Sequence, residues 1–167
     1  MISLWQQKPI KSFKHRNDNC HKQRGGMGGS NPYIKSADIT LPKTKYKIHF
    51  EPEDPSMGEP VCVEVDPAEI PHHETGQPGS LLSIALASGI DIDHSCGGVC
   101  ACSTCHVIIK EGLDTCNEAT DDELDQLEEA RGLTMQSRLS CQAVPDGTKD
   151  VRVVIPAWNV NLVKETH

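Results

Sequence analysis

Apolar side chains alternate with polar ones in two short stretches of the chain. Residues 46–50 place an apolar side chain at every second position, and residues 61–65 nearly do so. A period of two is typical of half-buried β-strands. Pro and Gly residues between the stretches, in residues 51–58, predict a turn. We therefore expect a β-hairpin.

Two helices are predicted by their starting residues and apolar spacing. Ser80 stands as an N-cap before residues 81–87, whose leucines share one face with Ala85, and Gly89 is placed to end that helix. Thr120 and Glu123 form a capping-box pattern that opens a second helix. We expect the second helix to stop at Gly132.

The remaining elements are short. Residues 107–109 read as a buried strand, residues 139–144 as extended chain and residues 150–155 as a last strand closed by Pro156. Loops are expected over residues 67–78 and 91–105. Because strands and helices are interspersed, the fold class is α+β, with one small sheet and a helix packed across it.

Residues 1–44 differ from the rest of the chain. They show no sustained hydrophobic period and contain a glycine cluster at residues 25–29, so we expect a flexible basic N-terminal extension. Residues 45–167 are expected to form one domain with a C-terminal tail. The total of 167 residues is enough for one sizeable core.

Charge is divided unevenly along the chain. Residues 1–45 carry nine Lys or Arg against two Asp, whereas the other 122 residues carry seven against 22 Asp or Glu. An acidic domain repels nucleic acid and attracts basic protein surfaces, so we expect no nucleic-acid partner. The longest uncharged run spans 16 residues and holds three Gly and a Pro, and no secretory signal opens the chain. Neither membrane insertion nor secretion is expected.

Five of the eight cysteines lie between residues 96 and 116. A disulfide scaffold spreads its cysteines along a short secreted chain, so this clustering indicates a metal instead. Cys96, Cys102 and Cys105 form C-x5-C-x2-C, and Cys141 is a distant fourth. A tight loop of thiolates plus one remote cysteine is the way a [2Fe–2S] cluster is held.

The composition of the loop suits such a cluster, whose two ferric irons, two sulfides and four thiolates carry a formal charge of about −2. Backbone N–H groups can offset that charge only if small residues let the chain wrap closely. The small residues expected around the sulfurs are Gly97, Gly98, Ala101 and Ser103.

Two other readings stay open from the residues alone. A zinc-stabilised protein-binding module could use the same four cysteines, and a redox dithiol could use Cys102 and Cys105. A Rieske centre is excluded, because the sequence lacks the paired histidine ligands that such a centre needs. Cys100 is interpreted as a small apolar filler behind the loop. The sequence supports no nucleophile–base pair and no open metal position, so an electron carrier is expected rather than an enzyme.

Two motifs resemble the adrenodoxin and bacterial Isc-type [2Fe–2S] ferredoxin family. They are Cys96-(x5)-Cys102-Ser-Thr-Cys105-His106 and Gly132-Leu-(x4)-Arg-Leu-Ser-Cys141-Gln. The resemblance covers residues 45–163 and implies a β-grasp fold, with Cys141 as the fourth ligand. Two departures are the region 56–79, which is longer than usual for the family, and Arg131, where members often carry an aromatic residue that contacts the counterpart of His106.

The resemblance also implies a function. Family members take one electron from an NAD(P)H-dependent ferredoxin reductase and pass it to the iron–sulfur cluster assembly machinery or to a cytochrome P450. We expect assembly proteins as the main acceptor and a monomeric carrier. The expected location is the bacterial cytoplasm, or the mitochondrial matrix if residues 1–44 are a transit peptide.

The second predicted helix has one strongly acidic face. At 100° per residue its acidic side chains fall on one side, opposite Leu124, Leu127 and Ala130. Like charges at this spacing repel, so stability does not explain the face. It is either a solvated surface or, as in the family, a docking surface for basic redox partners. His106 is expected to hydrogen-bond within the cysteine loop or toward this helix. The acidic residues are Asp121, Asp122, Asp125, Glu128 and Glu129.

Overall fold

The computed structural model describes residue 33 and residues 38–157. A five-stranded mixed sheet forms the centre of the fold, in the order β2-β1-β5-β3-β4. Strands β1 and β5 run parallel, and the other neighbours run antiparallel. The strands are β1 (Tyr46–Pro52), β2 (Val61–Val65), β3 (His106–Glu111), β4 (Ser137–Leu139) and β5 (Val151–Ile155).

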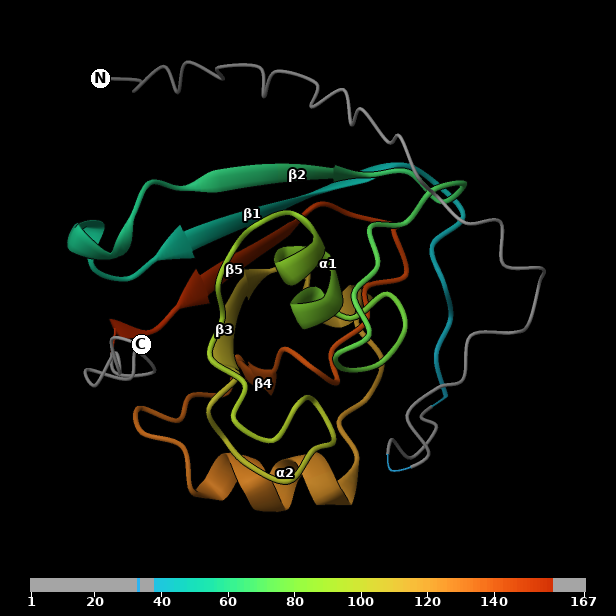
Figure 1. Ribbon diagram of the computed structural model, residues 1–167. Coiled ribbons are helices and arrows are strands. Elements are labelled where there is room, and N and C mark those ends of the chain that lie inside the picture. The colour runs from blue at the N-terminus through green and yellow to red at the C-terminus, as the bar shows by residue number, and fades with distance from the viewer. Residues whose placement is uncertain (1–32, 34–37, 158–167) are drawn as a thin grey trace, which may run out of the picture.

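The two helices lie at different places around the sheet (Figure 1). Helix α1 (Leu81–Ala87) lies across one face of the sheet, and helix α2 (Asp121–Glu128) lies beyond the edge formed by β4. Two short 3-10 turns, η1 (Pro55–Met57) and η2 (Leu113–Thr115), complete the elements. A mixed sheet with one helix across it confirms the predicted α+β class and the β-grasp fold.

The hydrophobic pattern explains the core. In β1 the side chains of Tyr46, Ile48 and Phe50 are buried, and the residues between them are half-buried. From α1, Leu81 and Leu82 are fully buried against the sheet. Burying each such side chain stabilises the fold by about 1.5–3 kcal/mol before the cost of ordering the chain. The predicted hairpin is confirmed by the antiparallel pairing of β1 with β2.

Both predicted N-caps are present, but α2 is shorter than expected. The Ser80 hydroxyl accepts from Ser83 N at 3.2 Å, and the Thr120 hydroxyl accepts from Glu123 N at 3.3 Å. The expectation that the second helix continues to Gly132 was wrong. Helix α2 ends at Glu128, and residues 129–132 form turns. Of the residues opposite the acidic side chains, Leu127 is buried, whereas 49% of the Leu124 surface is exposed.

A further correction concerns residues 139–144. They were expected to be extended, but β4 ends at Leu139 and residues 140–142 form a turn. No helix among the described residues is long and apolar enough to cross a membrane. The predicted boundary at residue 45 remains a prediction, and most of the N-terminal extension lies outside the described residues. Within its described part, the Thr44 hydroxyl donates to the Gly147 carbonyl at 2.6 Å.

Candidate iron–sulfur site

The cysteine loop, residues 94–106, connects α1 with β3 by a backbone that turns repeatedly into the left-handed region. Gly97 has φ of 69° and Gly98 has φ of 82°, and Cys100 has φ of 62°. Glycine takes such values without steric cost, whereas they are uncommon for other residues. Cys100 is half-buried against the core, in agreement with its expected role as a filler.

Gly98 is required by close packing as well as by its φ angle. A Cβ atom at this position would lie 2.3 Å from Gly76 N, a distance that no real side chain tolerates. Gly97, by contrast, has open space around the same position. Two of the predicted small residues therefore have different roles. Gly98 allows the loop preceding α1 to lie directly on the cysteine loop, while Gly97 supplies only a turn.

The four predicted ligands come together as two pairs of sulfur atoms. The Cys102 thiol interacts with the Cys96 thiol, and the Cys105 thiol with the Cys141 thiol. Among the described residues no three His, Cys, Asp or Glu side chains are grouped to hold a single metal ion. Two thiolates on each of two irons complete the four-cysteine ligand set of a [2Fe–2S] cluster. The donor set therefore fits that cluster.

The two pairs differ in burial. Cys105 and Cys141 are fully buried, whereas Cys96 and Cys102 are half-buried. Burial raises the pKa of Cys102, but hydrogen bonds from Ser95 and Thr104 outweigh it and lower that pKa to about 7. The pKa of Cys105 is raised, first by its hydrogen bond with Cys141 and then by burial. Iron binds the thiolate form, and the hydrogen bonds from Ser95 and Thr104 favour that form at Cys102.

Thr104 organises the more exposed pair, a role that the sequence alone did not assign. Its hydroxyl lies 3.2 Å from Cys102 Sγ and accepts from Ser95 N at 2.9 Å. Hydrogen bonds to cluster sulfurs are among the features that set the reduction potential. Its position between Cys102 and Cys105 in the sequence was the available signal. Of the other predicted residues, Ala101 is exposed, and the Ser103 carbonyl accepts from His106 N at 3.1 Å.

Helix α1 holds the turn that presents Cys141. The first N–H groups of a helix lack partners inside the helix. Here Leu81 N donates to the Ala143 carbonyl and Leu82 N to the Ser140 carbonyl, both at 2.9 Å. On the other side of the turn, the Ser140 hydroxyl donates to the Cys105 carbonyl at 2.8 Å. The turn is therefore fixed to both the helix and the cysteine loop.

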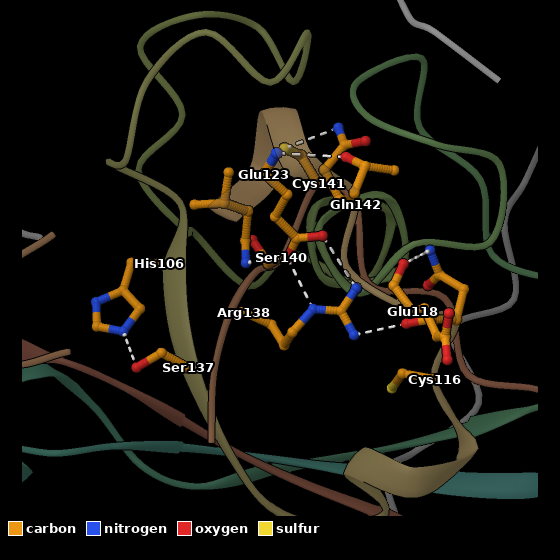
Figure 2. A network of polar contacts seen from close by, with 12 residues as sticks. His106, Cys116, Glu118, Glu123, Ser137, Arg138, Ser140, Cys141 and Gln142 are labelled. Carbon is orange, nitrogen blue, oxygen red and sulfur yellow. Dashed lines mark hydrogen bonds and ion pairs between the residues drawn. The ribbon is translucent and has the colours of Figure 1, made fainter. Parts of the chain in front are cut away.

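A buried ion pair connects α2 with the strand that leads to Cys141 (Figure 2). Arg138 Nε and Nη2 donate to the two carboxylate oxygens of Glu123, at 2.7 and 3.0 Å. Leu139 N also donates to Glu123, at 2.9 Å. Glu123 was expected as part of the capping box of this helix, and its buried partner Arg138 was missed. The available signal in the sequence was Arg138, a charged residue beside the apolar Leu139 in β4. A charged side chain that is buried needs a partner.

His106 is fully buried on β3, and burial lowers its pKa. Its Nε2 atom lies 2.8 Å from the Ser137 hydroxyl (Figure 2). Ser137 belongs to β4, outside both the cysteine loop and α2. The expected hydrogen bond within the loop is made by the backbone of His106, which donates to the Ser103 carbonyl, and not by its ring. The hydroxyl of Ser137 also accepts from Thr134 N at 2.9 Å. His106 thus connects β3 to the segment that follows α2.

The acidic face consists of Asp121, Asp122, Asp125, Glu128 and Glu129, all exposed to solvent. It adjoins the cysteine loop. A cavity of about 450 Å³ is lined by Asp122 and Asp125 on one side and by Val99 and Ala101 on the other. The site therefore combines a half-buried pair of thiols, a buried pair and a neighbouring anionic surface. A fold and site of this kind define an iron–sulfur electron-transfer protein.

Comparisons with known proteins agree. The family model of the 2Fe-2S iron-sulfur cluster binding domain matches residues 64–146. A 2Fe-2S ferredoxin of Haemophilus influenzae is 51% identical over 86 residues, which cover 52% of this chain and 75% of that protein. The chain belongs to the 2Fe-2S ferredoxin family. It carries electrons by means of one [2Fe–2S] cluster, so the zinc and dithiol readings were wrong.

Two further relatives extend the comparison. The crystal structure of an ISC-like [2Fe-2S] ferredoxin from Pseudomonas putida has a TM-score of 0.56 and 35% sequence identity, covering 71% of this chain and 98% of that one. A mitochondrial adrenodoxin homolog of Saccharomyces cerevisiae is 41% identical over 92 residues, 54% of either chain. The chain is thus similar to both bacterial and mitochondrial members, as the resemblance in its motifs predicted.

Proposed function

We propose that this ferredoxin takes electrons from an NAD(P)H-dependent ferredoxin reductase and delivers them to the iron–sulfur cluster assembly machinery. Cys96, Cys102, Cys105 and Cys141 ligate the cluster. The proposed carrier is a monomer of the bacterial cytoplasm. The observation that carries the proposal is the shared cavity of the acidic face and the cysteine loop, because a partner bound there lies next to the cluster.

The electrostatics favour basic partners. Five exposed carboxylates on and just after one short helix form a strong local negative field. Such a field accelerates encounter with a Lys- or Arg-rich surface and fixes its orientation. Because Cys96 and Cys102 are the less buried pair, the electron has its shortest route to a partner through their end of the cluster.

Assembly proteins are favoured over a cytochrome P450 by the likeness to a ferredoxin described as ISC-like. The test is a comparison of acceptors under anaerobic conditions. The protein is reduced by NADPH and a ferredoxin reductase, and then mixed with a cysteine desulfurase–scaffold complex or with a P450. We expect faster reoxidation, with cluster formation on the scaffold, in the first mixture. Faster reoxidation by the P450 would overturn the choice of acceptor.

The docking surface needs a control matched in charge. The variant Asp125→Lys/Glu128→Lys changes the acidic face. Glu59→Lys/Glu64→Lys makes the same charge change in β2 and just before it, at the opposite edge of the sheet. We expect only the first variant to slow reduction by the reductase. Equal slowing in both variants would show that the rate of reduction depends on net charge and not on a specific docking face.

A further inference from the structure

The loop that precedes α1 contributes a buried glutamine close to the site. Gln77 is 2% exposed, and its backbone N donates to the Cys141 carbonyl at 2.8 Å. The same loop carries Gly76, which lies directly against Gly98 and the Cys141 backbone. Gln77 is therefore held rigidly beside the turn that presents Cys141. It lies in the region that is longer than usual for the family.

A second buried glutamine stands between Gln77 and the sulfur. Gln142 is 5% exposed, and its Nε2 atom donates to Cys141 Sγ at 3.2 Å and to the Gly98 carbonyl at 3.4 Å. These two bonds use both hydrogens of its amide nitrogen. Its oxygen, Oε1, accepts from Gln77 Nε2 at 3.3 Å. The amide is thus satisfied on both sides in one orientation.

The orientation of that amide decides whether a hydrogen-bond donor or an acceptor faces the Cys141 sulfur. Rotated by half a turn, Gln142 would place its oxygen against the sulfur and the Gly98 carbonyl, and its nitrogen against the donor of Gln77. Every one of these contacts would then be repulsive. The Gly98 carbonyl and the Gln77 amide therefore both favour the orientation in which an N–H group points at Cys141 Sγ, and burial strengthens the bond.

We propose that Gln77 is a positioning residue, which raises the reduction potential of the cluster by holding the Gln142 amide with its N–H toward Cys141. One-electron reduction adds a negative charge to the cluster, so a donor to sulfur stabilises the reduced form more than the oxidised form. The inference rests on the proposed ligation by Cys141. It assigns a redox role to a loop otherwise interpreted as a connection.

The test is a redox titration of Gln77→Met in the holoprotein, followed by visible absorption. We expect the equilibrium for reduction to fall about tenfold, which for a one-electron couple is about 59 mV, with the [2Fe–2S] spectrum retained. In Gln142→Met the reduction potential should fall by at least as much. In the double variant it should fall no further than in Gln142→Met alone. A matched control is Gln136→Met, a half-buried glutamine whose amide donates to the Lys110 carbonyl, at 3.4 Å.

The outcomes separate this inference from the ligand assignment. An unchanged potential in Gln77→Met, or fully additive shifts in the double variant, would overturn the role of Gln77 while leaving Cys141 as ligand. Unchanged potentials in both single variants, with a native spectrum in Cys141→Ser, would overturn the ligand set itself. If Gln77→Met does not hold the cluster, Gln77→Asn keeps an amide of shorter reach and tests the same bond. Iron–thiolate stretching frequencies from resonance Raman spectra provide a second readout.

Discussion

Glu123 of α2 accepts hydrogen bonds from both Arg138 and the backbone of Leu139, two residues before Cys141. The helix that carries the acidic face is therefore tied to the strand that leads to Cys141, one member of the buried sulfur pair. The carboxylate is fully buried and Arg138 nearly so. The same helix thus has two functions, with its outer side chains facing solvent and Glu123 fixing its position.

Removing the Glu123 carboxylate should destabilise the protein strongly. In Glu123→Gln the Arg138 guanidinium loses its charged partner while it remains buried, which costs about 3–5 kcal/mol. The measurement is denaturant unfolding followed by far-UV circular dichroism. Glu128→Gln, on the exposed side of the same helix, should change stability by less than about 0.5 kcal/mol. Similar losses in the two variants would contradict the role of the buried pair.

Replacement of single cysteines should separate ligands from fillers. Serine at position 96, 102, 105 or 141 should abolish the native [2Fe–2S] absorption and EPR spectra or shift them strongly, because an alkoxide replaces a thiolate on iron. Cys100→Ala and Cys116→Ala should retain both spectra and two irons per chain. A native spectrum in any of the four ligand variants would show that the residue does not ligate iron.

The two glycines of the cysteine loop should respond differently to alanine. In Gly98→Ala the new methyl group meets the Gly76 backbone, 2.3 Å from its nitrogen, in addition to the strain of a positive φ. We expect a loss of about 2–5 kcal/mol and poor retention of the cluster. Gly97→Ala has only the φ strain and should lose about 1–2 kcal/mol. Thermal unfolding and the iron content after purification measure both effects, and equal losses would contradict the close packing.

Charge reversal on the acidic face should slow reduction in a salt-dependent manner. Asp125→Lys/Glu128→Lys should reduce the second-order rate constant with the reductase by about tenfold or more at low ionic strength. The difference should shrink as salt screens the exposed charges, and the visible spectrum should stay unchanged. Stopped-flow kinetics over a range of ionic strength provide the measurement. Rates that match the parent protein at every salt concentration would reject the docking surface.

Cys116 should be slow to react with alkylating agents. Burial raises the pKa of its thiol from 9.0 to about 11. At pH 9.0 the thiolate fraction, and with it the rate of reaction with iodoacetamide, should be about 50-fold below that of an ordinary thiol. Peptide mass spectrometry of the folded and the urea-unfolded protein measures the ratio. Equal rates in the two states would contradict the burial.

The same shift has a consequence for stability. A pKa raised by folding gives a stabilisation that is complete below pH 9.0, the value in the unfolded chain, and is lost as the pH rises toward about 11. In Cys116→Val, which has no thiol to ionise, the loss of stability between pH 9.0 and about pH 11 should be smaller.

Much of the fold could be predicted from local patterns. The alternation in residues 46–50 and 61–65 predicted the hairpin, and Ser80 and Thr120 predicted both helix starts, because these signals depend on neighbouring residues alone. The end of α2 could not be predicted in this way. No single residue before Gly132 marks it, and the helix ends where the chain turns toward β4.

The sequence by itself determined the chemistry of this protein. The spacing of three cysteines, the small residues among them and the remote Cys141 already favoured a [2Fe–2S] site over zinc or a redox dithiol, because ligand type and loop length follow directly from the order of residues. The acidic face was equally visible, since a helix repeats its faces every 3.6 residues.

Only the tertiary structure decided how the sulfurs are surrounded. The partners Glu123 with Arg138, Gln77 with Gln142, and His106 with Ser137 are 15, 65 and 31 residues apart, so no local pattern relates them. Their contacts arise because α2 and β3 both pack against β4, and because the loop before α1 lies against the Cys141 turn. Burial then makes each polar group require a partner, and packing determines which one is available.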